Sequence, residues 1–148
     1  MSLRSLHGCP DLKLNHELAK DCQKYAEELA KKGKMQHSDG DYGENLAYRE
    51  HSQQAYHSGK LASNHWYSEI KDYNFDGDEQ LNCGHFSQLI WKDCKEAGFG
   101  VALSADKKKV FVVGRYLPPG NWRGQWKENI PRPVSGEIYI PTDADIGN

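Results

Sequence analysis

The sequence has no long apolar run and no excess of charge of either sign. No stretch approaches the ~20 apolar residues that a membrane-spanning helix needs, and the first residues contain no apolar segment typical of a signal peptide. We therefore expect a protein that is neither inserted in a membrane nor secreted. The 19 Lys and Arg against 21 Asp and Glu give a net charge of -2, which excludes the basic field of a nucleic-acid-binding protein.

Cysteine is scarce, and its spacing matches no familiar framework. The chain has Cys9, Cys22, Cys83 and Cys94, with no CxxC pair and no zinc-finger spacing, which is too few for a disulfide scaffold. Cys22 and Cys94 fall on apolar faces of helical patterns, where a free cysteine packs as a small hydrophobic residue. The sequence therefore predicts reduced thiols and an intracellular setting.

The remaining composition is that of one globular domain, since 37% of the 148 residues are hydrophobic while the mean hydropathy of -0.86 indicates a polar surface. Apolar spacing predicts helices over 15–33, 60–75 and about 86–97. A β-hairpin is expected over 99–116, where two apolar runs flank an Asp/Lys-rich turn. Turn-forming residues predict a structured loop over 35–50, and prolines predict an extended tail after residue 131.

Four polar residues occupy positions that suggest chemistry. His37 and Glu44 fall in the predicted loop, Glu69 projects with the apolar residues of the second helix, and His85 stands at the start of the third. Two imidazoles and two carboxylates could form a metal site or an acid–base pair. The alternative is that the histidines cap or fill while the carboxylates accept backbone hydrogen bonds. Spacing alone favours that structural alternative.

Two further motifs are weaker. Residues 72–83 begin with the Asp72, Asn74, Asp76, Gly77 spacing of an EF-hand calcium loop, but the twelfth position is Cys83 where a bidentate Glu is needed. A solvated acidic loop is the better interpretation. Basic residues near the hairpin and tail could contact anionic lipid headgroups, although a solvated turn is commoner; they are Lys107, Lys108, Lys109, Arg123 and Lys127.

Four ordered segments carry a resemblance to a known family. "HSDGDYGENLA", "NHWYSEIKDYNF", "GHFSQLIWKDCKEAGFGVAL" and "VGRYLPPGN" resemble signature segments of the CAP superfamily of cysteine-rich secretory proteins, venom antigen 5 and plant pathogenesis-related proteins of class 1. The resemblance implies an α+β fold, a three-layer α-β-α sandwich with a small antiparallel sheet flanked by helices. It implies one CAP domain over 1–131, with the family's first helix cut short, and an extended tail over 132–148.

The resemblance also implies a cleft tetrad, which by motif is His37, Glu44, Glu69 and His85. In the family the two histidines can bind zinc, which here would be His37 and His85. No common enzymatic activity is established for the superfamily, and most members bind sterols, lipids or protein partners. We therefore expect a non-enzymatic binding protein. The alternative is a metal-assisted, protease-like hydrolase in which Glu44 or Glu69 activates a bound water.

Two departures indicate a branch of the family. Secreted members usually have cysteines where this chain has Phe99 and Arg115, so their disulfide framework is missing. The chain is most similar to the non-secreted, Golgi-associated pathogenesis-related proteins. That similarity implies a peripheral Golgi membrane protein that binds anionic lipid and forms homodimers, attached through an N-terminal myristoyl group. The myristoylation signal is absent from the sequence as it stands.

Overall fold

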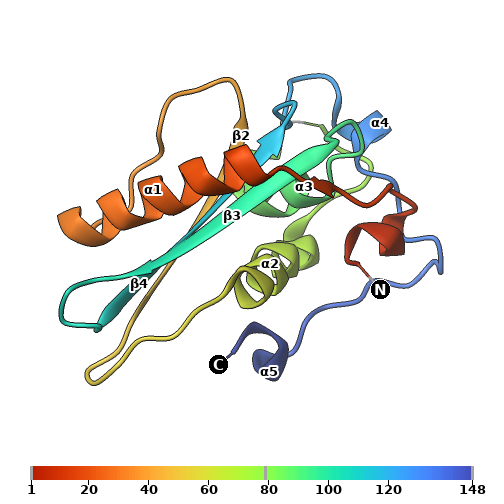
Figure 1. Ribbon diagram of the computed structural model, residues 1–148. Helices are drawn as coiled ribbons and strands as arrows, with labels where there is room; N and C mark the ends of the chain where they lie inside the picture. The colour runs from red at the N-terminus through yellow and green to blue at the C-terminus, as the bar shows by residue number, and fades with distance from the viewer. Residues whose placement is uncertain (1, 79, 148) are drawn as a thin grey trace.

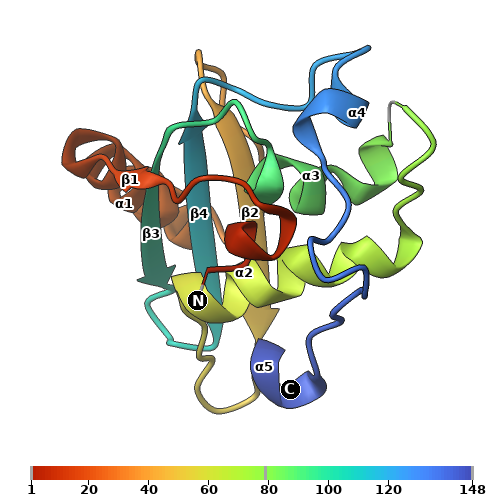
Figure 2. The ribbon, with the colours of Figure 1, turned by 90° about the vertical axis from the view of Figure 1, so that its right-hand side faces the viewer.

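The computed structural model describes residues 2–78 and 80–147, in which helices cover both faces of one four-stranded sheet (Figures 1 and 2). The strand order is β1-β3-β4-β2. The strands are β1 (Lys13–Leu14), β2 (Gly43–Glu50), β3 (Glu96–Leu103) and β4 (Lys109–Leu117). The predicted α-β-α sandwich is confirmed, with one difference. β1 pairs parallel to β3 while the other pairings are antiparallel, so the sheet is mixed.

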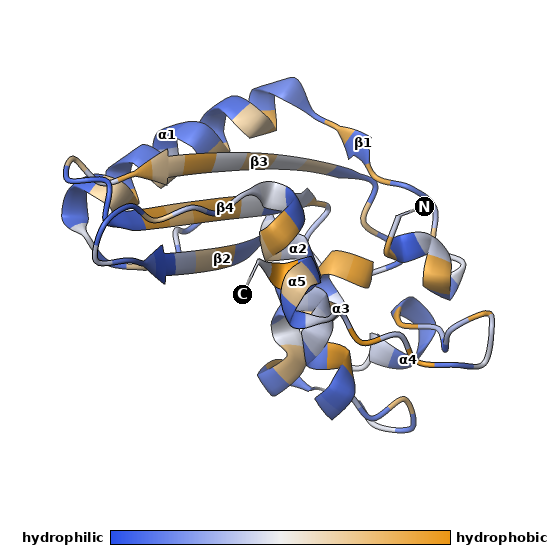
Figure 3. Ribbon diagram, turned by 90° about the horizontal axis from the view of Figure 1, so that it is seen from below, coloured by the Kyte–Doolittle hydropathy of each residue, from blue (hydrophilic) through white to orange (hydrophobic). Residues whose placement is uncertain are grey.

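Helix α1 (His16–Lys32) covers one face of the sheet and forms as predicted. Its N-cap Asn15 accepts a hydrogen bond from the Leu18 backbone N–H at 2.9 Å. Gly33 ends it in the left-handed conformation, with φ 74°, and donates to the carbonyl of Leu29. Figure 3 shows that α1 is largely hydrophilic (blue), whereas β3 and β4 are mostly hydrophobic or intermediate (orange or pale).

Two glycines of β3 bring the strand against the backbone of α1. A Cβ on Gly98 would lie 2.5 Å from the backbone nitrogen of Ala19, and one on Gly100 would lie 2.4 Å from that of Gln23. The Gln23 side chain exchanges two hydrogen bonds with the backbone of Val101, at 2.8 and 3.0 Å. Helix and strand therefore meet closer than any side chain would allow.

The opposite face is covered by α2 (Gly59–Tyr67), which continues as the 3-10 helix η2 (Ser68–Asp72), and by α3 (Gly84–Ile90), which follows η3 (Leu81–Cys83). The core between them is largely aromatic and contains Tyr67, Tyr73, Phe86, Trp91, Tyr116 and Trp126. All four cysteines are buried free thiols. Burial raises the pKa of each, to about 11 for Cys22, Cys83 and Cys94.

The predicted loop over 35–50 is wrong in its second half. β2 pairs antiparallel with β4 along its whole length, from Gly43 opposite Tyr116 to Glu50 opposite Lys109. Strand formation here depends on a partner more than 50 residues away in the sequence. The turn-forming residues correctly predict a loop only before Gly43, where β2 begins.

The third predicted helix, about 86–97, is too long, because α3 ends at Ile90. The buried guanidinium of Arg4, from the 3-10 helix η1 (Arg4–His7), donates to the carbonyls of Leu89, Trp91 and Cys94 at 3.1, 2.9 and 3.2 Å. Carbonyls held by Arg4 are not available to continue a helix. The chain then enters β3 at Glu96.

After β4 the chain forms α4 (Trp126–Asn129) and then runs back across the helices to α5 (Asp143–Ile146), which packs beside α2 (Figure 2). The Val134 N–H donates to the carbonyl of Leu6 at 2.9 Å. The Asn64 side chain donates to the carbonyl of Asp145, also at 2.9 Å. We call residues 131–147 the C-terminal segment.

Candidate functional site

The four residues singled out in the sequence form two His–Glu pairs. His37, in the loop before β2, places Nδ1 2.9 Å from Oε1 of Glu44 on β2. His85, near the start of α3, places Nδ1 2.8 Å from Oε2 of Glu69 in η2. In each pair the carboxylate fixes the orientation of the ring and leaves Nε2 as the free nitrogen.

Glu44 lies at the centre of a buried polar network. Its side chain is 4% exposed, whereas that of His37 is 63% exposed. The Ser38 backbone N–H and Arg115 Nε both lie 3.0 Å from the Glu44 carboxylate. Burial opposes ionisation, but the hydrogen bonds from Ser38, His37 and Arg115 outweigh it and hold the pKa of Glu44 below its usual value.

Arg115 anchors this network to α1. Its guanidinium lies 4.9 Å from the ring centre of Tyr25 and 4.3 Å from that of Tyr42, and it donates to Ser38 Oγ at 2.9 Å. The family motifs mark Arg115 only as a departure from a cysteine. Its position offers a signal, because alternation along β4 places it on the same face as the buried Phe111 and Val113.

The second pair sits at the start of α3. Oε1 of Glu69 accepts from the Phe86 backbone N–H at 3.1 Å, while its other oxygen accepts from His85. The His85 ring stacks on Trp66, with 6.3 Å between ring centres and 16° between planes. Each carboxylate therefore accepts a backbone hydrogen bond, as the structural alternative predicts, and also orients an imidazole. A binding role for the four residues stays a prediction.

A cavity of about 440 Å³ opens beside His85 and Glu69. His65 lines it too, as do Trp66, Lys71, Asn82 and Tyr48. His37 and Glu44 are outside that lining. The sequence motifs do not single out His65, although it stands four residues before Glu69 and hence one helical turn away.

The donor chemistry of the two pairs suits zinc, since a neutral imidazole whose other nitrogen donates to a carboxylate is a common zinc ligand. The residues that would hold the ion are His37 and His85, through Nε2. Over residues 2–78 and 80–147, no group of three or more His, Cys, Asp or Glu side chains is placed to hold a metal ion.

The EF-hand-like loop serves another purpose. Asp76 forms an ion pair with Arg132 at 2.7 Å. The Asp78 carboxylate accepts from the backbone N–H groups of Gly124 and Trp126, at 3.1 and 3.3 Å. These acidic side chains therefore tie the loop to the segment around α4, where Asp78 satisfies backbone donors at the start of that helix.

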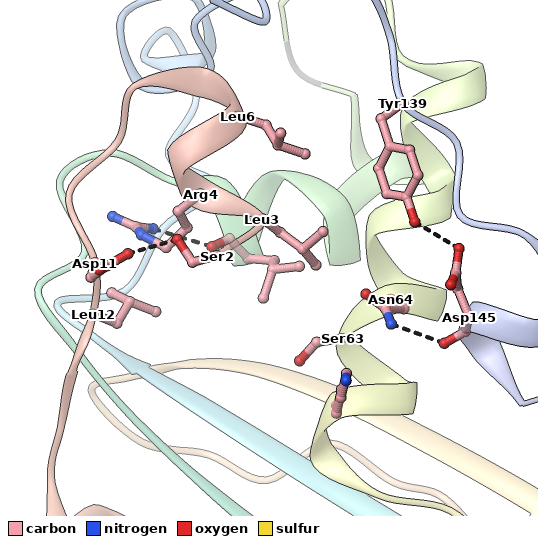
Figure 4. Close-up of a pocket in the computed structure, with 12 residues that line it drawn as sticks. Ser2, Leu3, Arg4, Leu6, Asp11, Leu12, Ser63, Asn64, Tyr139 and Asp145 are labelled. Atoms are coloured by element: carbon pink, nitrogen blue, oxygen red, sulfur yellow. Dashed lines mark hydrogen bonds between the residues drawn. The ribbon is translucent and has the colours of Figure 1, made fainter.

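A second cavity, of about 830 Å³, lies between η1, α2 and the C-terminal segment (Figure 4). Its apolar lining comes from Leu3, Leu6, Leu12, Leu89 and Tyr139. Ser2, Arg4, Asp11, Lys60, Ser63, Asn64 and Asp145 add polar groups. Figure 4 shows Tyr139 pointing to Asp145, and their hydrogen bond is 2.6 Å long. No sequence motif predicts this cavity, because the residues that line it come from segments far apart in the chain.

The family that the fold and the motifs indicate is also the one found when the sequence is compared with known protein families. Residues 2–116 match the family model of the CAP, or cysteine-rich secretory protein, family. The match covers most of the chain, and we conclude that this protein belongs to the CAP family.

Two relatives refine that placement. The chain is 40% identical over 137 residues to Golgi-associated plant pathogenesis-related protein 1 of Homo sapiens, covering 88% of this chain and 86% of that protein. It is 34% identical over 142 residues to secreted protein RBT4 of Candida albicans, but covers only 36% of that longer protein. The structure of BmVAL-1 has the same fold, with a TM-score of 0.65, 22% identity and coverage of 92% of this chain and 69% of that one.

Among the helices of the described residues, none has both the length and the apolar character needed to cross a bilayer.

Proposed function

We propose that this protein is a non-enzymatic CAP-domain protein that binds a lipid or sterol in the 830 Å³ cavity. The supporting observation is the lining itself, four leucines and a tyrosine with polar groups at the margin. Small-molecule sites have volumes of roughly 300–1,000 Å³ and combine apolar walls with a few polar groups. A protein partner is the other ligand class that the family resemblance implies.

The test is titration with a fluorescent fatty acid and a fluorescent sterol, using wild type, Leu6→Gln and the control Leu81→Gln. Leu6 lines the cavity, whereas Leu81 is 68% exposed and lies outside that lining. We expect Leu6→Gln to weaken binding at least ~10-fold, since it places a polar amide in the cavity wall, and Leu81→Gln to leave it unchanged. Equal affinities for both variants, or no binding by wild type, would contradict the proposal.

Zinc between His37 and His85 is the second part of the proposal. Neutral Nε2 atoms on two carboxylate-oriented rings support it. Calorimetric titration should show weaker zinc binding for His37→Ala/His85→Ala than for wild type. The control is His16→Ala/His51→Ala, which removes two exposed histidines. Equal affinity in all three proteins would remove the metal site, and sedimentation with and without zinc would reveal any homodimer linked to the metal.

A hydrolase is less well supported, because a general base needs a carboxylate that can reach water. Glu44 is buried and accepts from Ser38, His37 and Arg115. Glu69 faces the 440 Å³ cavity, but both of its oxygens already accept hydrogen bonds. If the protein nevertheless hydrolyses a peptide substrate, loss of that activity in Glu44→Gln or Glu69→Gln would favour the enzyme over the binding protein.

One observation favours an additional contact with anionic lipid, as expected of a peripheral Golgi protein. The end of α1 and the β3–β4 turn lie at the same end of the molecule (Figure 1), where six lysines gather: Lys31, Lys32, Lys34, Lys107, Lys108 and Lys109. Near an anionic surface each lysine contributes about 1 kcal/mol. Co-sedimentation with phosphatidylserine vesicles should fall for Lys107→Glu/Lys108→Glu and stay unchanged for Lys13→Glu/Lys95→Glu.

A further inference from the structure

His57 is a buried histidine without hydrogen bonds. It precedes Ser58, the N-cap of α2, and its residue is only 4% exposed. Neither ring nitrogen has a hydrogen-bond partner in the structure as described. A buried polar ring normally has a partner, so this histidine is destabilising where it stands and becomes more so when it acquires a charge.

The ionisable groups that act on His57 among the described residues are both cationic when charged. They are Arg49 on β2 and His65 on α2. Burial, followed by repulsion from Arg49 and His65, lowers the pKa of His57 to about 4. The folded arrangement therefore holds His57 neutral.

The same Arg49 holds the end of the C-terminal segment. Its guanidinium donates to the carbonyls of Ile146 and Gly147. Ala55 and Tyr56, immediately before His57, line a small cavity of about 390 Å³ together with Arg49 and Gly147. The loop that carries His57 and the end of the C-terminal segment are thus in one place.

The C-terminal segment also forms one wall of the 830 Å³ cavity, through Tyr139 and Asp145 (Figure 4). Its middle, before α5, is lightly held, because Val134, Ile138 and Ile140 are 73%, 52% and 49% exposed, whereas Ile146 of α5 is buried at 8%. A segment with few buried contacts opens at low free-energy cost. Its displacement would open the cavity on that side.

We propose that the C-terminal segment is a strap over the large cavity and that protonation of His57 releases it. The proposal rests on the proposed function only for the identity of the cavity's ligand. When the strap and the 51–58 loop open, His57 becomes hydrated and gains distance from Arg49, so the open state accepts a proton more readily than the closed one. Acid therefore favours opening, and bound ligand leaves faster.

The sign and size follow from linkage. An open-state pKa near the ordinary 6.5 and a closed-state pKa of about 4 leave the closed state fully favoured at neutral pH. Its advantage declines as the pH falls from 6.5 towards 4. Between pH 7.5 and pH 5.0 the ratio of open to closed molecules should rise about 30-fold.

Hydrogen exchange with mass spectrometry tests the strap without any ligand. After correction for the intrinsic pH dependence of exchange, wild-type peptides from 51–58 and 131–147 should lose protection about 30-fold between pH 7.5 and pH 5.0, while α1 and β4 keep theirs. His57→Leu should abolish this loss, since leucine cannot be protonated. The control His51→Leu, which removes an exposed histidine in the same loop, should keep it.

Three outcomes would overturn the proposal: an undiminished pH response in His57→Leu, an equal loss of protection across the whole chain, or a response abolished by His51→Leu. If His57→Leu does not fold, as judged by circular dichroism, His57→Gln serves in its place. Release of a fluorescent fatty acid at the two pH values adds a second readout. Failure to bind that probe at any pH would remove the proposed function, while the exchange data would still decide the strap.

Discussion

Arg115 holds the buried polar network behind His37 together. It is 6% exposed and bonds both Glu44 and Ser38 between two tyrosine rings. The sequence indicated His37, Glu44, Glu69 and His85 through ordered family motifs. It did not indicate the pairing of Arg115 with Glu44, because β2 and β4 are far apart in the sequence and are brought together only by folding.

Removing Arg115 should destabilise the protein strongly. Arg115→Met leaves the Glu44 carboxylate buried without its cation, and breaking a buried pair typically costs about 3–5 kcal/mol. The control Arg132→Met breaks the exposed pair with Asp76 and should cost less than about 1 kcal/mol. Urea denaturation measures both free energies of unfolding, and similar losses in the two variants would contradict this view of Arg115.

Glu44 should also shape stability in acid. Its folded pKa lies below the ordinary value of 4.5, so it contributes stability above about pH 4.5 that disappears as the pH falls through the folded pKa. Glu44→Gln should therefore lose less stability than wild type between pH 5 and pH 2, starting from a lower value at neutral pH. The exposed Glu137→Gln is the control, and a wild-type slope in Glu44→Gln would exclude this role.

At the scale of elements, the sheet and its helices were predicted where local signals dominate. α1 has an N-cap, an apolar face and a terminating glycine, and all three function as read. β2 and the end of α3 were predicted incorrectly. β2 forms by pairing with β4, and α3 ends where the Arg4 guanidinium binds the carbonyls of Trp91 and Cys94. Neither boundary can therefore be predicted from the residues of its own segment.

The contact of α1 with β3 should tolerate no side chain at its closest points. Gly100→Ala places a Cβ 2.4 Å from the backbone nitrogen of Gln23, and the helix backbone cannot shift without disturbing its packing. We therefore expect the free energy of unfolding to fall by about 1–3 kcal/mol. Gly59→Ala is the matched control, because its Cβ would lie 3.8 Å from Phe99 at the first position of α2. Thermal denaturation should separate the two, and a stable Gly100→Ala would refute the close packing.

For the molecule as a whole, no disulfide joins the layers in the described residues, and the four thiols are buried with raised pKa values. The aromatic core and buried polar clamps such as Arg4 hold the layers together instead. Reduced thiols were expected from their spacing and the absence of the family cysteines at Phe99 and Arg115. The large cavity was not expected, since Leu6, Leu89 and Tyr139 meet only in the finished fold.

The thiols should be inert until the protein unfolds. Ellman's reagent should react slowly with the native protein and should titrate four thiols in denaturant, because thiolates form rarely at these pKa values and the sulfur atoms are covered. A reductant should leave the melting temperature unchanged. Rapid reaction of a native thiol, or a melting temperature that falls with dithiothreitol, would contradict a fold without covalent crosslinks.

The Gln23 amide has a consequence for how copies of this protein meet. β3 has β1 beside it only at Glu96 and Ala97, and beyond them its outer rim would offer unpaired backbone groups on which a foreign strand could add. Gln23 occupies both groups of Val101 as a neighbouring strand would, and α1 lies directly over Gly98 and Gly100. A foreign strand therefore cannot add at Val101 without displacing Gln23, which hinders aggregation through strand addition at this edge.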